Sequence, residues 1–152
     1  MLNVLENIVK GIAWAVLAAA VLCTVYLAML RGRRSNRLRA SLSGWVYAHR
    51  GYHSEPDAPE NSREAFRRAA ARGFGAELDV HLLADGGLAV IHDSHLQRMT
   101  GLPGDVEDLT VPQLAGCRLG ASRETIPQFS EVLAICGGRA PLIIELKTRG
   151  RN

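Results

Sequence analysis

The longest hydrophobic segment of the chain lies near its N-terminus. Residues 11–30 form twenty consecutive positions without a charged side chain. At about 1.5 Å per residue, a helix of this length spans roughly 30 Å, the thickness of a bilayer's hydrocarbon core. Trp14 and Tyr26 lie toward its two ends, where amphipathic rings prefer the membrane interface. The pattern predicts a transmembrane anchor over residues 1–31 that contacts the lipid bilayer through residues 11–30.

Basic residues follow this segment at once. Five arginines lie between residues 31 and 39, against Lys10 and Glu6 before the segment. The positive-inside rule predicts a single-pass membrane protein whose C-terminal side is cytoplasmic, and the arginines could also hold anionic lipid head groups. We interpret residues 32–44 as a basic linker. A cleaved signal peptide is the alternative, but the apolar run is long and no A-x-A motif precedes the arginines.

Short apolar runs and amphipathic segments alternate after the linker. Strands are expected at 44–49, 75–83 and 141–147, and helices at 61–73 and 126–138. The pattern at 84–93 predicts a turn and a further strand, which would form a hairpin with the strand expected at 75–83. Residues 94–125 are mostly loop, with a short helix near the sequence VPQLAGC. Strand–helix alternation predicts an α/β fold with parallel strands and crossover helices.

The expected helix at 61–73 carries signals at both ends. Asn61 or Ser62 can cap its start, Glu64 would complete a capping box with Asn61, and Gly73 would end it. Residues 45–152 supply about a third to a half of the roughly 250 residues that a closed (β/α)₈ barrel needs. The domain is therefore expected to contain only the first few β/α units of such a barrel.

Charge and cysteine content narrow the classes of function. Residues 1–40 carry six basic and one acidic side chain, whereas residues 41–152 carry 12 basic and 14 acidic ones. The basic balance of the chain thus belongs to its N-terminal stretch, and with aromatic residues at 5% we expect no nucleic-acid partner. The three cysteines are an odd number without metal-ligand spacing, which favours reduced, packed thiols.

Acidic residues on two of the expected strands suggest a cation site. Glu77 and Asp79 are two apart and point to the same strand face, and Glu145 shares a face with Lys147 on the last strand. Carboxylates in this arrangement suit a hard divalent cation, Mg²⁺ or Ca²⁺, while Lys147 would suit an anionic substrate. A solvated face with ion pairs, or a buried ion pair on the last strand, are the structural alternatives. His81, on the same face, is interpreted as a bystander.

Two histidines lie at the ends of expected strands. His49 ends the first strand and His92 the third, so both could lie at one mouth of the sheet and act as general acid and base. Arg50 offers a bidentate fork for a phosphate. His53 and His95 are interpreted as surface loop residues. The combined set points to metal-assisted phosphodiester cleavage.

These motifs together resemble those of the glycerophosphodiester phosphodiesterase family. The matching stretches run in family order over residues 46–148: AHRG (48–51), PENS (59–62), residues 65–101, IPQFSEVL (126–133) and IIELK (143–147). The resemblance implies a TIM barrel of the PLC-like phosphodiesterase type over residues 45–152. It also implies hydrolysis of glycerophosphodiesters to sn-glycerol 3-phosphate and an alcohol.

The resemblance further implies roles for individual residues. His49 and His92 would be the catalytic acid/base pair. Glu77, Asp79 and Glu145 would hold the divalent ion. Arg50 and Lys147 would contact the substrate phosphate. Glu60, Asn61 and Asp93 would support the site.

The chain departs from the family pattern in three places. PENS stands for the commoner PENT, and IPQF replaces a pattern with Thr and Leu. After IIELK only TRGRN follows, whereas the family continues through several strand–helix units, so the phosphodiesterase domain is expected to be incomplete. A phospholipase D acting on lysophospholipids or sphingomyelin is the alternative enzyme, with a lysolipid substrate. An inactive, membrane-tethered fragment is the non-enzymatic alternative.

Overall fold

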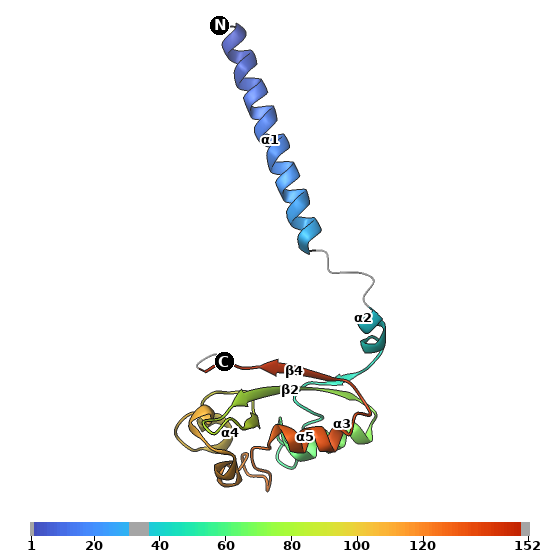
Figure 1. Cartoon of the computed structure of the whole chain (residues 1–152), viewed down its shortest axis with the longest axis vertical. Coiled ribbons are helices and arrows are strands. Elements are labelled where there is room, and N and C mark those ends of the chain that lie inside the picture. The colour runs from blue at the N-terminus through green and yellow to red at the C-terminus, as the bar shows by residue number, and fades with distance from the viewer. Residues whose placement is uncertain (1, 31–36, 150–152) are drawn as a thin grey trace. The chain divides into compact units, whose positions relative to one another are not determined.

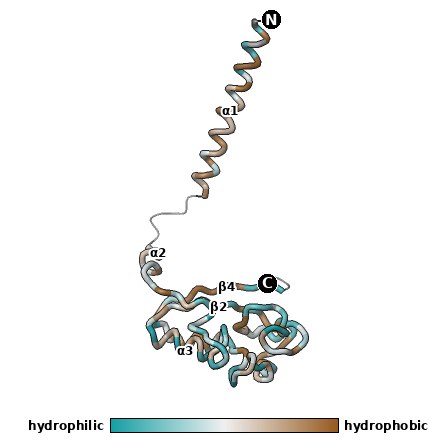
Figure 2. Tube along the Cα trace, turned by 180° about the vertical axis from the view of Figure 1, so that it is seen from behind, coloured by the Kyte–Doolittle hydropathy of each residue, from teal (hydrophilic) through white to brown (hydrophobic). Residues whose placement is uncertain are grey.

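The computed structural model describes residues 2–30 and 37–149 of the chain. It divides into two compact units, Met1–Ser43 and Gly44–Asn152. The first unit contains helix α1, Leu2–Leu30, and the short helix α2, Arg37–Leu42. Its stretch Glu6–Leu30 is long and apolar enough to cross a membrane, and Figure 2 shows hydrophobic colour along much of α1. The segment predicted as a linker thus contains a helix, while Arg31, Arg33 and Arg34 lie outside the described residues.

A four-stranded sheet forms the centre of the second unit (Figure 1). Strand β2, Gly75–Leu82, pairs in parallel with β1, Tyr47–Ala48, and with β4, Leu142–Leu146. Strand β3, Leu88–Val90, pairs antiparallel to β2 and completes the expected hairpin. The prediction of an α/β fold with parallel strands is confirmed, although β1 is shorter than the apolar run at 44–49.

Two helices cover one face of this sheet. Helix α3, Arg63–Ala71, and helix α5, Phe129–Cys136, lie side by side along it (Figure 1). Period-two alternation turns Leu78 and Val80 of β2 toward these helices, where they pack with buried Phe66 and Val132. The opposite face of β2 therefore carries Glu77, Asp79 and His81.

A second apolar cluster supports the segment between β3 and α5. This segment contains helix α4, Gln97–Thr100, and the 3₁₀ helices η1, Val106–Asp108, and η2, Val111–Gly116. Leu96, Val106 and Leu114 pack there against Ile91, which follows β3. The helix expected near VPQLAGC is present, but it is a 3₁₀ helix.

The ends of the two main helices test the capping predictions. The side chain of Ser62 accepts a hydrogen bond from Ala65 N and caps α3. The capping box expected between Asn61 and Glu64 is wrong, because the Asn61 amide is bonded elsewhere and Glu64 pairs with Arg68 instead. Helix α5 ends at Gly137 in the left-handed conformation, as its glycines indicated.

Candidate active site

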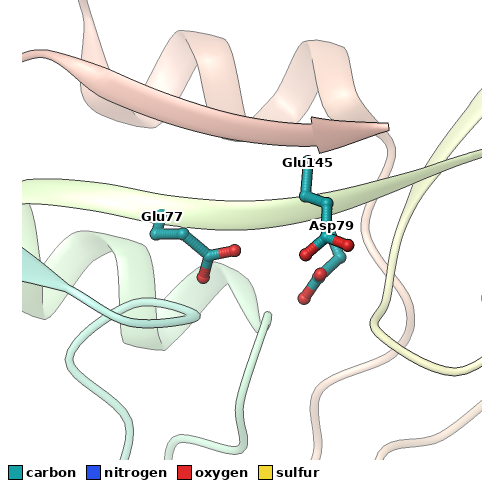
Figure 3. Close-up of side chains that lie close together, drawn as sticks. All are labelled: Glu77, Asp79 and Glu145. Carbon is teal, nitrogen blue, oxygen red and sulfur yellow. The ribbon is translucent and has the colours of Figure 1, made fainter. Parts of the chain in front are cut away.

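Three carboxylates converge on the sheet face that the helices leave free (Figure 3). Glu77 and Asp79 project from β2, and Glu145 projects from β4, where the register pairs it directly with Asp79. One oxygen atom from each lies within 4.8 Å of the others. Glu145 lies next to the carboxyl end of β4, the end at which ligands of parallel α/β sheets bind, whereas Glu77 and Asp79 lie earlier along β2.

Asp79 is the most enclosed member of this acidic cluster (Glu77, Asp79 and Glu145), with 1% of its surface exposed. Its Oδ2 accepts a hydrogen bond from Asn61 Nδ2 at 3.0 Å and lies 3.5 Å from Arg50 Nε. Its Oδ1 lies 3.2 Å from Lys147 Nζ, yet this buried atom accepts no hydrogen bond among the described residues. A buried carboxylate needs such cationic neighbours to stay ionised.

Lys147 bridges two members of the acidic cluster. Its Nζ donates to Glu145 Oε1 at 2.8 Å and lies beside Asp79, and only 6% of its side chain is exposed. Burial lowers the pKa of Lys147, but the two carboxylates outweigh it and hold the pKa above its ordinary value. The lysine is therefore a fixed positive charge at neutral pH.

A tight turn after β1 brings His49 and Arg50 to the same face. Arg50 adopts a left-handed φ of 54°, and Gly51 follows with a φ of 80°. This turn lets Arg50 N donate to Glu77 Oε2 at 3.0 Å. His49 Nε2 lies 3.8 Å from the same oxygen, and 69% of the His49 side chain is exposed to solvent. The imidazole of His49 is thus free to meet a ligand.

The second histidine is held by an adjacent acid. His92 Nδ1 lies 2.7 Å from Asp93 Oδ1. Arg98 hydrogen-bonds Asp93 and lowers its pKa to about 2, so Asp93 is ionised at neutral pH and can only accept. His92 Nδ1 must then carry the proton of this hydrogen bond. The tautomer leaves Nε2 of a neutral His92 as the basic nitrogen.

Glu60 lies between two arginines. Its Oε1 accepts from Arg50 Nη1 at 3.1 Å and from Arg98 Nη2 at 2.6 Å. Burial raises the pKa of Glu60, but the hydrogen bonds and charges of Arg98 and Arg50 outweigh it, and the net pKa is below the ordinary value. Glu60 is therefore an ionised link between the turn after β1 and the loop after β3.

These contacts join all ten residues singled out in the sequence, but only through one residue that the sequence did not indicate. Arg98 connects Glu60 with Asp93, and thereby His92 with the acidic cluster. Its segment lacks a clear periodicity, and its one sequence signal is a basic residue five positions after Asp93. His53 and His95 lie on the surface outside this network. Buried His81 bonds Glu107 and touches the network only at the backbone carbonyl of His92.

The acidic cluster has the chemistry of a divalent-cation site. Its donors are all carboxylate oxygens, which hard cations prefer. One oxygen atom from each carboxylate lies within 4.8 Å of the others, so a single ion could contact all three. Asp79 Oδ1 is a buried oxygen without a hydrogen bond. These residues therefore fit a bound divalent ion.

Fold and site together define a class of α/β protein related to (β/α)₈ barrels, with an acidic site on one face of two parallel strands. A family model fixes the assignment. The model described as "Glycerophosphoryl diester phosphodiesterase family" matches residues 49–150. The chain belongs to this family.

Individual relatives agree with the family model. The chain is 40% identical over 111 residues to a glycerophosphodiester phosphodiesterase of Caldanaerobacter subterraneus, covering 68% of this chain and 45% of that protein. It is 39% identical over 98 residues to bovine glycerophosphodiester phosphodiesterase 1, covering 59% and 29%. The chain thus spans less than half the length of these relatives.

Solved structures share the fold of the second unit. A phosphodiesterase of Oleispira antarctica, solved in complex with the product sn-glycerol-3-phosphate, matches with a TM-score of 0.63 and 30% identity over 71% of this chain and 46% of its own. A glycerophosphodiester phosphodiesterase of Thermotoga maritima matches with a TM-score of 0.59 and 36% identity over 68% and 43%. These neighbours are TIM-barrel proteins, and the parallel strands β1, β2 and β4 correspond to part of such a barrel, whereas β3 is antiparallel.

Proposed function

We propose that this chain carries the residues for metal-dependent hydrolysis of glycerophosphodiesters to sn-glycerol 3-phosphate and an alcohol. The proposal rests on one observation: the three carboxylates of the acidic cluster converge, and Arg50 and Lys147 lie beside its buried member, Asp79. The three carboxylates carry one more charge than Arg50 and Lys147 balance, so the site would attract a metal cation. The basic side chains of Arg50 and Lys147 would attract a phosphodiester anion. Membership of the family and the product complex of the Oleispira relative support this substrate class.

The histidines have the environments that acid/base catalysis requires. Hydrolysis breaks the phosphorus–oxygen bond to the alcohol and forms one to the attacking hydroxyl or water. One imidazole would take the proton of that nucleophile, and the other would give a proton to the departing alkoxide. His92 is positioned for such transfer at Nε2 because Asp93 holds its Nδ1–H. His49 is exposed beside Glu77.

The charged side chains would act on the phosphate. Arg50 and Lys147 would bind the phosphoryl oxygens and offset the charge that develops on them. Glu77, Asp79 and Glu145 would hold Mg²⁺ or Ca²⁺, which when bound supplies Lewis-acid stabilisation of the same oxygens. Glu60, Asn61 and Asp93 would keep Arg50, Asp79 and His92 in place through the hydrogen bonds described above.

The test is release of glycerol 3-phosphate from glycerophosphocholine by the full chain in detergent micelles. Activity should need added Mg²⁺ or Ca²⁺, vanish with EDTA and fall at least about 100-fold in Asp79→Asn, which weakens the charge around Lys147 and Arg50. Asp108→Asn is the matched control, because Asp108 is an exposed acid paired with Arg149. A folded wild-type chain that releases no glycerol 3-phosphate with either ion would contradict the proposal and favour an inactive fragment.

A lysolipid is the second candidate substrate. The observation in its favour is the apolar helix Glu6–Leu30, which would hold the enzyme beside membrane lipids. We infer an anchor over residues 1–31 with the catalytic domain, residues 45–152, on the cytoplasmic side after the basic linker 32–44. Turnover of lysophosphatidylcholine above that of glycerophosphocholine would favour the phospholipase D activity. Protease digestion of the domain only in inverted vesicles, whose cytoplasmic face points outward, would support the orientation.

A further inference from the structure

We propose that Arg98 is a positioning residue of this site, one that fixes the two histidine-bearing segments relative to each other. The inference rests on the proposed function, because it concerns the geometry of the same acid/base pair. Arg98 lies in α4, and its carboxylate partners lie on two different segments. Arg98 lies within the matching stretch 65–101, but it is not among the residues to which the resemblance gives a role.

The contacts of Arg98 form a cross-link. Its Nη2 donates to Glu60 Oε1 at 2.6 Å and to Asp93 Oδ1 at 3.0 Å, and its Nε donates to Asp93 Oδ2. Glu60 also accepts from Arg50, the neighbour of His49, and Asp93 accepts from His92. The guanidinium therefore connects the turn after β1 with the loop after β3 through two ionised carboxylates.

Arginine is suited to this task in a way that other side chains are not. Its planar guanidinium carries five N–H donors in fixed directions, so two carboxylates that bind it are held at a fixed angle and distance. Its positive charge also offsets the repulsion between Glu60 and Asp93. A lysine could supply the charge, but its single ammonium lacks the planar fork.

The backbone that carries Arg98 is itself held in place. The adjacent Met99 is buried in the second apolar cluster, and its carbonyl accepts a hydrogen bond from Gly120 N at 2.7 Å. Helix α4 ends at Gly101, which adopts a left-handed φ of 72°. The backbone of Arg98 is thus held by a packed core, while 49% of its side chain is exposed.

Arg98 acts by orienting His92. Asp93 can hold His92 Nδ1 in one direction only while the carboxylate itself is fixed, and its second oxygen is fixed by Arg98. Loss of Arg98 would let Asp93 and His92 rotate together, and Glu60 would release part of its hold on Arg50. Since proton transfer depends on sub-ångström placement, the loss should reduce turnover rather than substrate binding.

Steady-state kinetics of the full chain with glycerophosphocholine test this role. Arg98→Gln should lower kcat by about 10- to 100-fold, as loss of supporting hydrogen bonds does at other sites, while KM changes less than about threefold. Arg98→Lys should recover part of kcat. Arg67→Gln is the matched control, because Arg67 is about as exposed as Arg98, at 53% against 49%, and its ion pairs among the described residues are with Glu64 and Glu124. An unchanged kcat, or an increase in KM alone, would overturn the inference.

A second readout separates this inference from the proposed function. The ¹⁵N spectrum of the imidazoles, in chains labelled at histidine, reports whether His92 Nδ1 keeps its proton in the hydrogen bond to Asp93. Arg98→Gln should shift the His92 signals toward those of a mobile imidazole, and Arg67→Gln should not. This holds whether or not the wild-type chain turns over substrate. Unchanged His92 signals in a folded Arg98→Gln chain would refute the cross-link by themselves.

Discussion

Replacing Gly51 by alanine should destabilise the second unit more than any other glycine-to-alanine change at a left-handed position. Gly51 has a φ of 80°, and an added Cβ would lie 2.8 Å from Ala65 Cβ and 2.9 Å from Ala65 C. Ordinary carbon contacts are about 3.5–4.0 Å. Ala65 is fully buried in the first turn of α3, and its carbonyl accepts a hydrogen bond from Tyr52 N, so it has nowhere to move.

The magnitude follows from two separate costs. The left-handed conformation costs a residue with a Cβ about 1–2 kcal/mol, and overpacking against a fixed backbone adds about 1–3 kcal/mol. Gly51→Ala should therefore lower the free energy of unfolding by about 2–5 kcal/mol. Gly73→Ala is the matched control, because Gly73 has a φ of 68° but no atom within 4 Å of its added Cβ, and it should lose only the first amount.

The assay is urea unfolding of the full chain in micelles, followed by circular dichroism. The difference between the two variants isolates the contact with Ala65, since both residues adopt the same backbone region. Gly51→Ala should also reduce glycerol 3-phosphate release, because the neighbouring Arg50 takes its place in the site from this turn. If Gly51→Ala unfolds at the same urea concentration as Gly73→Ala, the argument from close packing is refuted.

Three further predictions concern the charges and the core. Asp79→Asn should weaken divalent-ion binding at least tenfold by isothermal titration, and binding equal to wild type would place the ion elsewhere. Asp93→Asn should lower the free energy of unfolding at pH 6 by up to about 2 kcal/mol. This is an upper bound, because water screens the half-exposed Arg98. Arg98 lowers the pKa of Asp93 from 3.8 to about 2, so this contribution is complete above about pH 5 and is lost as the pH falls through about 2. The difference between variant and wild type in thermal unfolding should therefore shrink steadily from about pH 5 to below pH 2. Leu78→Ala should lower the free energy of unfolding, measured with urea, by about 2–5 kcal/mol, because Leu78 is fully buried between β2 and the helices. A smaller loss would mean that the core is loosely packed.

The carboxylate face could be predicted from the sequence because two simple rules determine it. Alternation along a strand puts Glu77 and Asp79 on one side, and parallel strands bring their carboxyl ends to one edge. The direct pairing of Asp79 with Glu145 could not be predicted, because strand register depends on the packing of the whole sheet. Nor could the almost complete burial of Asp79, which results from three polar neighbours contributed by three other segments.

Arg98 and Asn61 show what sequence patterns leave out. Arg98 lies in the short helix α4, whose segment has no periodic pattern, and its partner Glu60 is 38 positions away. Asn61 has the composition of a helix cap, but it adopts a left-handed φ of 56° and gives its amide to Asp79, so Ser62 caps the helix in its place. In both cases a contact between distant segments determines the role of the residue. Local sequence propensity gives no information about such a contact.

Strand β4 connects the exposed part of the sheet with the chemistry of the site. Its sequence, LIIEL, is the nearly continuous apolar run of a parallel strand covered on both faces. Yet Ile143, Ile144 and Leu146 are exposed in the described residues, Leu146 at 77%, and Figure 2 shows the hydrophobic colour along this strand. Glu145 on the same strand is the most exposed of the three carboxylates, whereas Asp79 on covered β2 is buried. Period-two alternation puts Ile143 and Glu145 on one face of β4, so an element that packs over Ile143 would also restrict the Glu145 side chain. Such an element should strengthen cation binding, because Glu145 would then lose less side-chain entropy when the ion binds.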